Sequence, residues 1–139
     1  MKQIAEGLWQ GALRHVHEQG LPAEITAVAL MATQVESVPL RPGVLFIYFP
    51  IDDNADGLDA ETFKVCIALA DFLKDFKVLT ICHMGENRSG LLSSLILGAR
   101  GVDAETAVKT VQQRGNPNKD RGYSFWNPGF VRQVREWLG

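Results

Sequence analysis

The apolar residues of this chain gather in short runs that are separated by polar, glycine-rich or proline-rich stretches. Runs of four to eight apolar and β-branched residues between such stretches are typical of β-strands. They occur at residues 25–30, 44–49 and 78–81, and a run broken by two glycines at residues 4–11 suits a further short strand. The first three runs contain almost no polar positions, which indicates strands that are buried on both faces.

Apolar positions at helical spacing, together with capping residues, predict the helices. Asp59 and Asp103 are of a type that commonly caps a helix N-terminus, and Asn127 followed by proline is a typical helix start. The predicted helices cover residues 12–19, 59–76, 91–99, 103–114 and 128–138. Because strands and helices alternate along the chain, the pattern predicts an α/β fold: a central, mostly parallel sheet of about four to five strands flanked by helices.

Length and charge narrow the class of protein further. A chain of 139 residues is most simply one domain, residues 1–139. The formal net charge of −2 gives no indication of a nucleic-acid partner or of binding to a membrane surface. No apolar run approaches the roughly 18 residues of a membrane span, and two cysteines do not make a disulfide framework. We therefore expect a cytoplasmic monomer.

The most informative stretch is residues 78–90, with the sequence VLTICHMGENRSG. A strand leads to Cys82, a tight loop follows, and an apolar helix begins near Arg88; we call residues 82–88 the cysteine loop. A loop that curls into a helix N-terminus directs successive backbone N–H groups at one point, and such a nest binds oxyanions. The guanidinium of Arg88 can hold two oxygens at once, and Gly85 lets the backbone turn sharply and approach a ligand.

These residue types predict a nucleophilic cysteine beneath a bound phosphate group. The positive end of a helix favours the thiolate, which is the nucleophilic form of cysteine. Cys82 would lie under the phosphorus atom, and the Ser89 hydroxyl would steady the sulfur when it leaves. Arg88 and the loop backbone would bind the phosphate oxygens. The other substrate-binding positions are His83, Met84, Gly85, Glu86 and Asn87. The alternative is that Cys82 is only a small buried residue and Arg88 only a solvated helix start.

An acidic loop, residues 50–57, follows the strand predicted at residues 44–49. Loops that leave the same end of neighbouring parallel strands converge on one crevice, so this loop could overhang Cys82. Attack on a phosphate ester requires a proton for the departing oxygen, and a carboxylic acid is a suitable donor. The candidates are Asp52, Asp53 and Asp56. Carboxylates in a turn are also ordinary solvated turn residues.

The cysteine loop resembles the signature of the cysteine-dependent protein tyrosine phosphatases, His-Cys-x2-Gly-x2-Arg-Ser/Thr. Cys82, Gly85, Arg88 and Ser89 match it, whereas Ile81 stands where the family usually has histidine. Both ends of the chain also resemble compact dual-specificity phosphatases. The opening Ile-x2-Gly-Leu-x2-Gly occurs at residues 4–11 and the closing Asn-x-Gly-Phe-x2-Gln at residues 127–133.

The resemblance extends to the acidic loop and to function. Residues 50–54 resemble the general-acid loop of dual-specificity phosphatases, Pro-Val-x-Asp-Asn, which points to Asp53 as the general acid. The family implies a dual-specificity phosphatase fold and a phosphomonoester hydrolase that forms a phosphocysteine intermediate and needs no metal or other cofactor. Its substrate would be a phosphorylated protein or another phosphomonoester. Glu86 would repel additional negative charge, which favours a substrate with a single phosphate.

Two other classes of function stay open. A sulfurtransferase or an arsenate reductase also uses a cysteine loop that ends in arginine, and neither needs the acidic loop. A binding module would hold phosphorylated partners without hydrolysing them.

Other reactive side chains have simpler interpretations. Cys66 falls on the apolar face of the helix predicted at residues 59–76, which indicates a core residue; the alternative is a redox partner of Cys82. His15 and His17 are two positions apart and would face different ways on a helix, so we expect solvated side chains rather than a metal pair.

The segment from 116 to 126 is polar and carries three aromatic rings, Tyr123, Phe125 and Trp126. The rings could line a pocket for an aryl phosphate. Such rings more often anchor a loop to the core, and we favour that interpretation.

Overall fold

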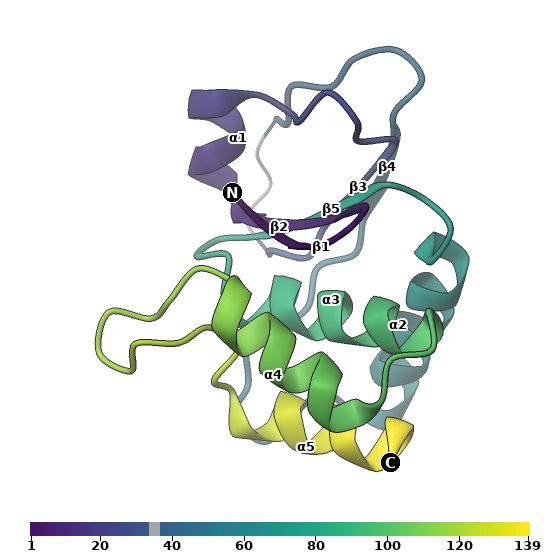
Figure 1. Cartoon of the computed structure of the whole chain (residues 1–139), viewed down its shortest axis with the longest axis vertical. Coiled ribbons are helices and arrows are strands. Elements are labelled where there is room, and N and C mark those ends of the chain that lie inside the picture. The colour runs from purple at the N-terminus through teal and green to yellow at the C-terminus, as the bar shows by residue number, and fades with distance from the viewer. Residues whose placement is uncertain (34–36) are drawn as a thin grey trace.

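The computed structural model describes residues 1–33 and 37–139, and within them the chain forms an α/β fold on a single sheet. Its strands are β1 (Lys2–Ala5), β2 (Leu8–Ala12), β3 (Ala27–Leu30), β4 (Leu45–Tyr48) and β5 (Val78–Cys82). Their order across the sheet is β1-β2-β5-β3-β4 (Figure 1). β1 runs antiparallel to β2, and every other neighbouring pair is parallel, which confirms the predicted, mostly parallel sheet.

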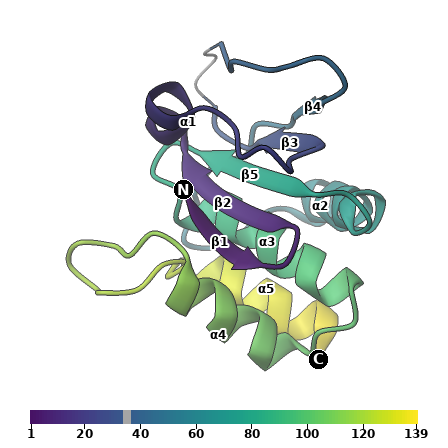
Figure 2. The ribbon, with the colours of Figure 1, turned by 45° about the horizontal axis from the view of Figure 1, so that its top comes forward.

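The helices cover the two faces of the sheet unequally (Figure 2). They are α1 (Leu13–Gln19), α2 (Ala60–Leu73), α3 (Asn87–Ala99), α4 (Ala104–Arg114) and α5 (Pro128–Leu138). α1 lies on one face, and the other helices lie together on the opposite face. α3 packs on β5 and β2 and is itself covered by α2, α4 and α5, so it is buried along most of its length. None of the helices in the described residues is long and apolar enough to span a membrane.

Two of the predicted caps fix the starts of helices as expected. The side chain of Asp59 accepts a hydrogen bond from the backbone N–H of Thr62 over 2.7 Å, and α2 begins at the next residue. Asp103 accepts in the same way from the N–H of Thr106 over 3.0 Å, at the start of α4. Each carboxylate satisfies a backbone N–H that has no partner within the helix.

The N-terminal run at residues 4–11 is not one strand. Gly7 has a φ of +67°, a left-handed conformation that glycine adopts easily, and the chain reverses there. β1 and β2 are consequently an antiparallel hairpin that supplies two strands of the sheet. Gly7, which interrupts the apolar run, therefore lies in the turn between two strands.

The prediction that residues 44–49 are buried on both faces is wrong. β4 forms as a strand, but it lies at the edge of the sheet, where Leu45, Phe46 and Tyr48 are 37%, 38% and 40% exposed. β3 and β5 occupy inner positions and are buried throughout, as predicted. The run at residues 44–49 is no less apolar than the other two, so strand position decides the difference.

Candidate active site

The predicted nucleophile lies where β5 meets α3. Cys82 is the last residue of β5, and only 2% of it is exposed. α3 begins at Asn87, so Arg88 and Ser89 lie in the first turn of this helix. The predicted sequence of strand, tight loop and buried helix is therefore present, and β5 is an inner strand with a parallel neighbour on each side.

In the first turn of α3, Ser89 reaches the expected partner, Cys82, and Arg88 contacts the acidic loop. The Ser89 hydroxyl lies 3.1 Å from the Cys82 sulfur, and both atoms are buried. A hydroxyl in this position can donate a hydrogen bond to a sulfur anion. Arg88 is half-buried, and its guanidinium donates to the carbonyl of Ile51 over 3.5 Å. The arginine of the cysteine loop is thereby held next to the acidic loop.

Gly85 is required both by conformation and by space. Its φ is +70°, and a Cβ there would lie 2.7 Å from the carbonyl carbon of Gly11 and 2.8 Å from the nitrogen of Ala12. These are backbone atoms at the end of β2, which cannot move aside as a side chain would. The side chain of Gln10 also donates to the Gly85 carbonyl over 3.0 Å. The cysteine loop thus packs in direct contact with the end of β2.

We expect Gly85→Ala to lower the stability of the fold. A left-handed conformation costs a residue with a Cβ about 1–2 kcal/mol, and the contact with β2 adds to this cost. In thermal unfolding, Tm should fall by about 4–8 °C. Gly122→Ala is the matched control, since Gly122 has a φ of +78° and nothing within 4 Å of its Cβ position. Equal Tm values for the two variants would show that the close approach to β2 contributes nothing.

Asp53, in the acidic loop, contacts the residue at the start of α3. Its two carboxylate oxygens accept hydrogen bonds from the amide groups of Asn87, over 3.1 Å, and Asn127, over 2.7 Å. Asn87 is the residue directly before Arg88. The structure therefore brings Asp53 together with the start of α3, as the convergence of loops in a parallel sheet leads one to expect.

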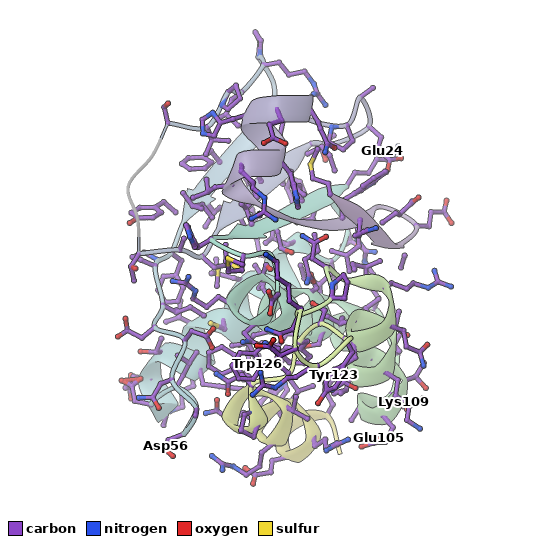
Figure 3. All side chains as sticks on the ribbon, turned by 90° about the vertical axis from the view of Figure 1, so that its left-hand side faces the viewer. Glu24, Asp56, Glu105, Lys109, Tyr123 and Trp126 are labelled. Atoms are coloured by element: carbon purple, nitrogen blue, oxygen red, sulfur yellow. The ribbon has the colours of Figure 1, made fainter. Side chains whose placement is uncertain are left out.

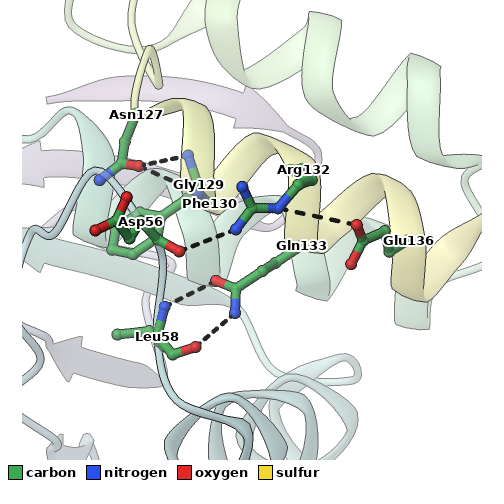
Figure 4. Close-up of polar contacts among 8 residues, drawn as sticks. All are labelled: Asp56, Leu58, Asn127, Gly129, Phe130, Arg132, Gln133 and Glu136. Atoms are coloured by element: carbon green, nitrogen blue, oxygen red, sulfur yellow. Dashed lines mark hydrogen bonds and ion pairs between the residues drawn. The ribbon is translucent and has the colours of Figure 1, made fainter.

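The other two carboxylates of the acidic loop are placed differently. Among the described residues, the carboxylates of Asp52 and Asp56 make no hydrogen bond to the cysteine loop. The backbone carbonyl of Asp56 accepts from Arg132 over 2.9 Å, and the side chain of Gln133 bonds both the N–H and the carbonyl of Leu58 (Figure 4). The end of the acidic loop is therefore fastened to α5.

Asn127 is a site residue whose role the sequence analysis missed. Its side-chain oxygen accepts from the N–H groups of Gly129 and Phe130, over 2.9 and 3.1 Å, and so caps α5 as predicted (Figure 4). Its side-chain nitrogen holds Asp53, and its backbone N–H donates to the side-chain oxygen of Asn87 over 2.9 Å. Asn127 is 1% exposed. The sequence correctly predicted the cap, which uses the side-chain oxygen of Asn127. It did not indicate the contact that the side-chain nitrogen makes.

The side chain of Glu86 is held by two donors from the segment at residues 116–126, and its expected repulsion of additional negative charge stays a prediction. Glu86 is 7% exposed and accepts hydrogen bonds from Asn118 over 3.0 Å and from the indole N–H of Trp126 over 2.8 Å. Both donors bond the same oxygen, Oε1, which offsets part of the cost of burying this carboxylate. At Asn87 both ends of the side-chain amide are engaged, by Asp53 and by the backbone N–H of Asn127.

The rings of residues 116–126 mainly anchor that segment, as the favoured interpretation predicts. Phe125 is fully buried and packs so closely on α3 that a Cβ at Gly90 would lie 2.9 Å from its ring. Trp126 bonds Glu86, and the guanidinium of Arg121 lies 3.8 Å from the centre of its ring. Tyr123 is 42% exposed on the connection between α4 and α5 (Figure 3).

The second cysteine belongs to the core. Cys66 is fully buried in the hydrophobic core, where burial raises the pKa of its thiol from 9.0 to about 12. Both cysteines are free thiols. The predicted core role of Cys66 is confirmed, and its thiol has little capacity to act as a nucleophile at neutral pH.

The expectation of two solvated histidines is wrong for His15. Its Nδ1 accepts a hydrogen bond from the backbone N–H of Ala12 over 3.2 Å at the start of α1, and the residue is half-buried. Burial, followed by positive neighbours that include Arg14, lowers the pKa of His15. His17, two positions on, is exposed.

Comparisons with known proteins agree with this arrangement at the level of the fold. No family model matches the chain, and no curated protein matches its sequence. Among solved structures, human DUSP28 is 19% identical, with 99% of this chain and 97% of that chain covered and a TM-score of 0.69. OH1, a tyrosine phosphatase from the Orf virus, is 16% identical, with 98% and 84% covered and a TM-score of 0.69.

A third similar structure carries a different description. The human tyrosine phosphatase-like serine/threonine/tyrosine-interacting protein is 22% identical, with 99% of this chain and 94% of that chain covered and a TM-score of 0.67. These likenesses show that the chain has the fold of the compact dual-specificity and tyrosine phosphatases. At such low identity they show the fold alone.

Proposed function

We propose that the chain is a phosphomonoester hydrolase that works through a phosphocysteine intermediate. The observation that carries this proposal is the meeting of four side chains at one loop. Ser89 lies at the sulfur of Cys82, Arg88 lies beside the acidic loop, and Asp53 is tied to the residue before Arg88. A buried structural cysteine would need none of these neighbours.

In the first step the Cys82 sulfur attacks the phosphorus atom of the bound ester. The sulfur–phosphorus bond forms while the bond to the leaving oxygen breaks, and Asp53 gives that oxygen a proton. Arg88 and the backbone N–H groups of the cysteine loop hold the remaining phosphate oxygens as charge shifts between them. The products of this step are the free alcohol or phenol and a cysteine thiophosphate.

In the second step a water molecule replaces the sulfur. Asp53, now a carboxylate, takes a proton from the water as it attacks phosphorus, and the electron pair of the sulfur–phosphorus bond returns to Cys82. The Ser89 hydroxyl donates a hydrogen bond to the departing sulfur, which stabilises the anion. Inorganic phosphate leaves, and the enzyme returns to its starting state without a metal or other cofactor.

We infer the substrate class from the exposure of the residues next to the nucleophile. His83 and Met84, which come directly after the nucleophile, are exposed, Met84 by 44%. An exposed rim can admit a short phosphorylated side chain as well as a long one, so we infer a dual-specificity site that acts on phosphorylated proteins or similar phosphomonoesters.

The proposal is tested by hydrolysis of p-nitrophenyl phosphate in the presence of a metal chelator. We expect phosphate release at an undiminished rate, since this mechanism requires no metal. A sulfurtransferase would instead form a persulfide on Cys82 when treated with thiosulfate. A binding module, a role that the name of the tyrosine phosphatase-like interacting protein suggests for that relative, would bind phosphopeptides in competition with phosphate and release none. Either result without turnover would overturn the proposal.

A further inference from the structure

Gln10 is a polar side chain that is fully buried in β2. Side chains alternate between the two faces of a strand, so Gln10 shares its face with Leu8 and Ala12, which are also fully buried. An apolar residue would continue the pattern of this face. Burial of an amide is costly unless hydrogen bonds satisfy it, so the partners of Gln10 indicate its role.

The partners of Gln10 are two carbonyl groups of the cysteine loop. Its side-chain nitrogen donates to the carbonyl of Gly85 over 3.0 Å and to the carbonyl of Glu86 over 3.4 Å. The Gln10 amide therefore joins β2 to the middle of the loop. It does so next to the place where Gly85 packs against the backbone at the end of β2.

These two bonds also set the direction of two backbone N–H groups. A peptide bond is planar and trans, so a carbonyl and the N–H of the next residue point in opposite directions. Because the carbonyls of Gly85 and Glu86 face Gln10, the N–H groups of Glu86 and Asn87 face away from it. Neither N–H has an acceptor in the part of the chain that the structure describes. Such N–H groups at the start of a helix are available to a ligand anion.

The other end of the Gln10 amide has no partner. Among the described residues, Gln10 Oε1 and the hydroxyl oxygen of Ser124 are the two buried side-chain polar atoms without a hydrogen bond. Both side chains border Gly115, where a Cβ would lie 2.7 Å from the Ser124 hydroxyl and 2.9 Å from Gln10 Nε2. An unpaired buried oxygen lowers stability, and an apolar side chain of similar length would avoid that loss. What the glutamine supplies, and an apolar residue does not, is the pair of bonds to the loop.

We propose that Gln10 is a positioning residue that holds the N–H groups of Glu86 and Asn87 in the direction needed to bind phosphate oxygens. The inference rests on the proposed phosphatase function and adds to it a residue from outside the cysteine loop. Gln10 is buried and does not touch the substrate, so it acts through these two peptide groups. Donors that are held in place stabilise the transition state well, because they need not reorient as charge develops on the phosphate oxygens.

The test is Gln10→Met, which keeps the approximate length of the side chain and removes the donor. It should lower kcat/KM for p-nitrophenyl phosphate, and raise the inhibition constant of inorganic phosphate, each about three- to tenfold. Thr80→Val is the matched control, because Thr80 pairs with Gln10 in the sheet and its buried hydroxyl bonds Ser93. This control loses a buried hydrogen bond that does not reach the loop, so both constants should stay near their wild-type values. Equal losses in the two variants would overturn the proposal.

A site-resolved measurement separates positioning from a general loss of structure. Backbone amide NMR spectra of Cys82→Ser protein are recorded while inorganic phosphate is added, so that binding is followed without turnover. The N–H resonances of Glu86 and Asn87 should shift. In Cys82→Ser/Gln10→Met protein at saturating phosphate, these two shifts should be smaller relative to the shift of the Met84 N–H, which follows a carbonyl that Gln10 does not hold. Unchanged relative shifts would overturn the role of Gln10.

The same spectra distinguish failure of this inference from failure of the proposed function. Absence of p-nitrophenyl phosphate hydrolysis in wild type would reject the catalytic proposal, and the phosphate shifts would then decide the role of Gln10. If no N–H of the cysteine loop shifts with phosphate, both proposals are rejected.

A wild-type measurement covers the case in which Gln10→Met does not fold. The side-chain NH₂ protons of Gln10 should exchange slowly with solvent and should shift when phosphate binds. The reason is that their acceptor carbonyls belong to peptide groups whose N–H would bind the anion, and linked hydrogen bonds polarise one another. Rapid exchange, or no shift on phosphate binding, would contradict the proposal.

Discussion

Cys82→Ser is expected to abolish the hydrolysis of aryl phosphates while phosphate binding survives. A serine hydroxyl is close in size to the thiol, so the cysteine loop and Arg88 should keep their positions around the ligand. It is a far poorer nucleophile and leaving group, and both steps of the proposed reaction depend on the sulfur. The measurements are initial rates with p-nitrophenyl phosphate, and the binding of inorganic phosphate by calorimetry.

The matched control is Cys66→Ala, which removes the other thiol of the chain. Cys66 is fully buried and its pKa is raised to about 12, so it has no part in the proposed chemistry. This variant should keep its specific activity at a temperature well below its Tm, although loss of a buried side chain lowers stability. Acid-quenched wild-type enzyme should carry one phosphoryl group on Cys82, detected by mass spectrometry. A Cys82→Ser enzyme that still turns over would show that the sulfur is not the nucleophile.

The fold was largely predictable because its signals are local. The apolar runs that became β3 and β5, the caps Asp59 and Asp103, and the strand, loop and helix around Cys82 each depend on a few consecutive residues. The exposure of β4 was not predictable in this way. It depends on the order of strands in the sheet, which the composition of a single strand does not contain.

The same distinction between local and long-range signals applies to the candidate site. The residues of the cysteine loop are near one another in sequence, and the structure places Cys82, Ser89 and Arg88 together. The direction of the Glu86 side chain depends instead on Trp126, which lies 40 positions further along the chain. The side-chain nitrogen of Asn127, which takes no part in the cap, donates to Asp53, 74 positions earlier in the chain. Helix caps can be predicted from neighbours, but the second partner of a capping side chain requires the tertiary structure.

The second prediction concerns Asp53, whose carboxylate is held by the amides of Asn87 and Asn127. If Asp53 protonates the leaving oxygen, Asp53→Asn should lower kcat/KM, which reports the first step, about 10²–10⁴-fold for phenyl phosphate, whose leaving group is strongly basic. The loss should be much smaller for p-nitrophenyl phosphate, because nitrophenolate departs more easily without a proton. Loss of the base in the second step should lower kcat for both substrates alike, because both form the same phosphocysteine. The dependence on leaving group separates the loss of an acid from general damage to the site.

Two neighbouring variants locate the acid and its support. Asp52→Asn is the matched control and should not alter the ratio of the two rates; if it does and Asp53→Asn does not, the general acid is the preceding residue. Asn87→Ala removes the donor that lies 3.1 Å from one Asp53 oxygen, while the carboxylate group itself is retained. Because the amide acts through the orientation of Asp53, this variant should show the same leaving-group order with a smaller loss. An equal loss for both substrates would mean that Asn87 supports the cysteine loop and not the acid.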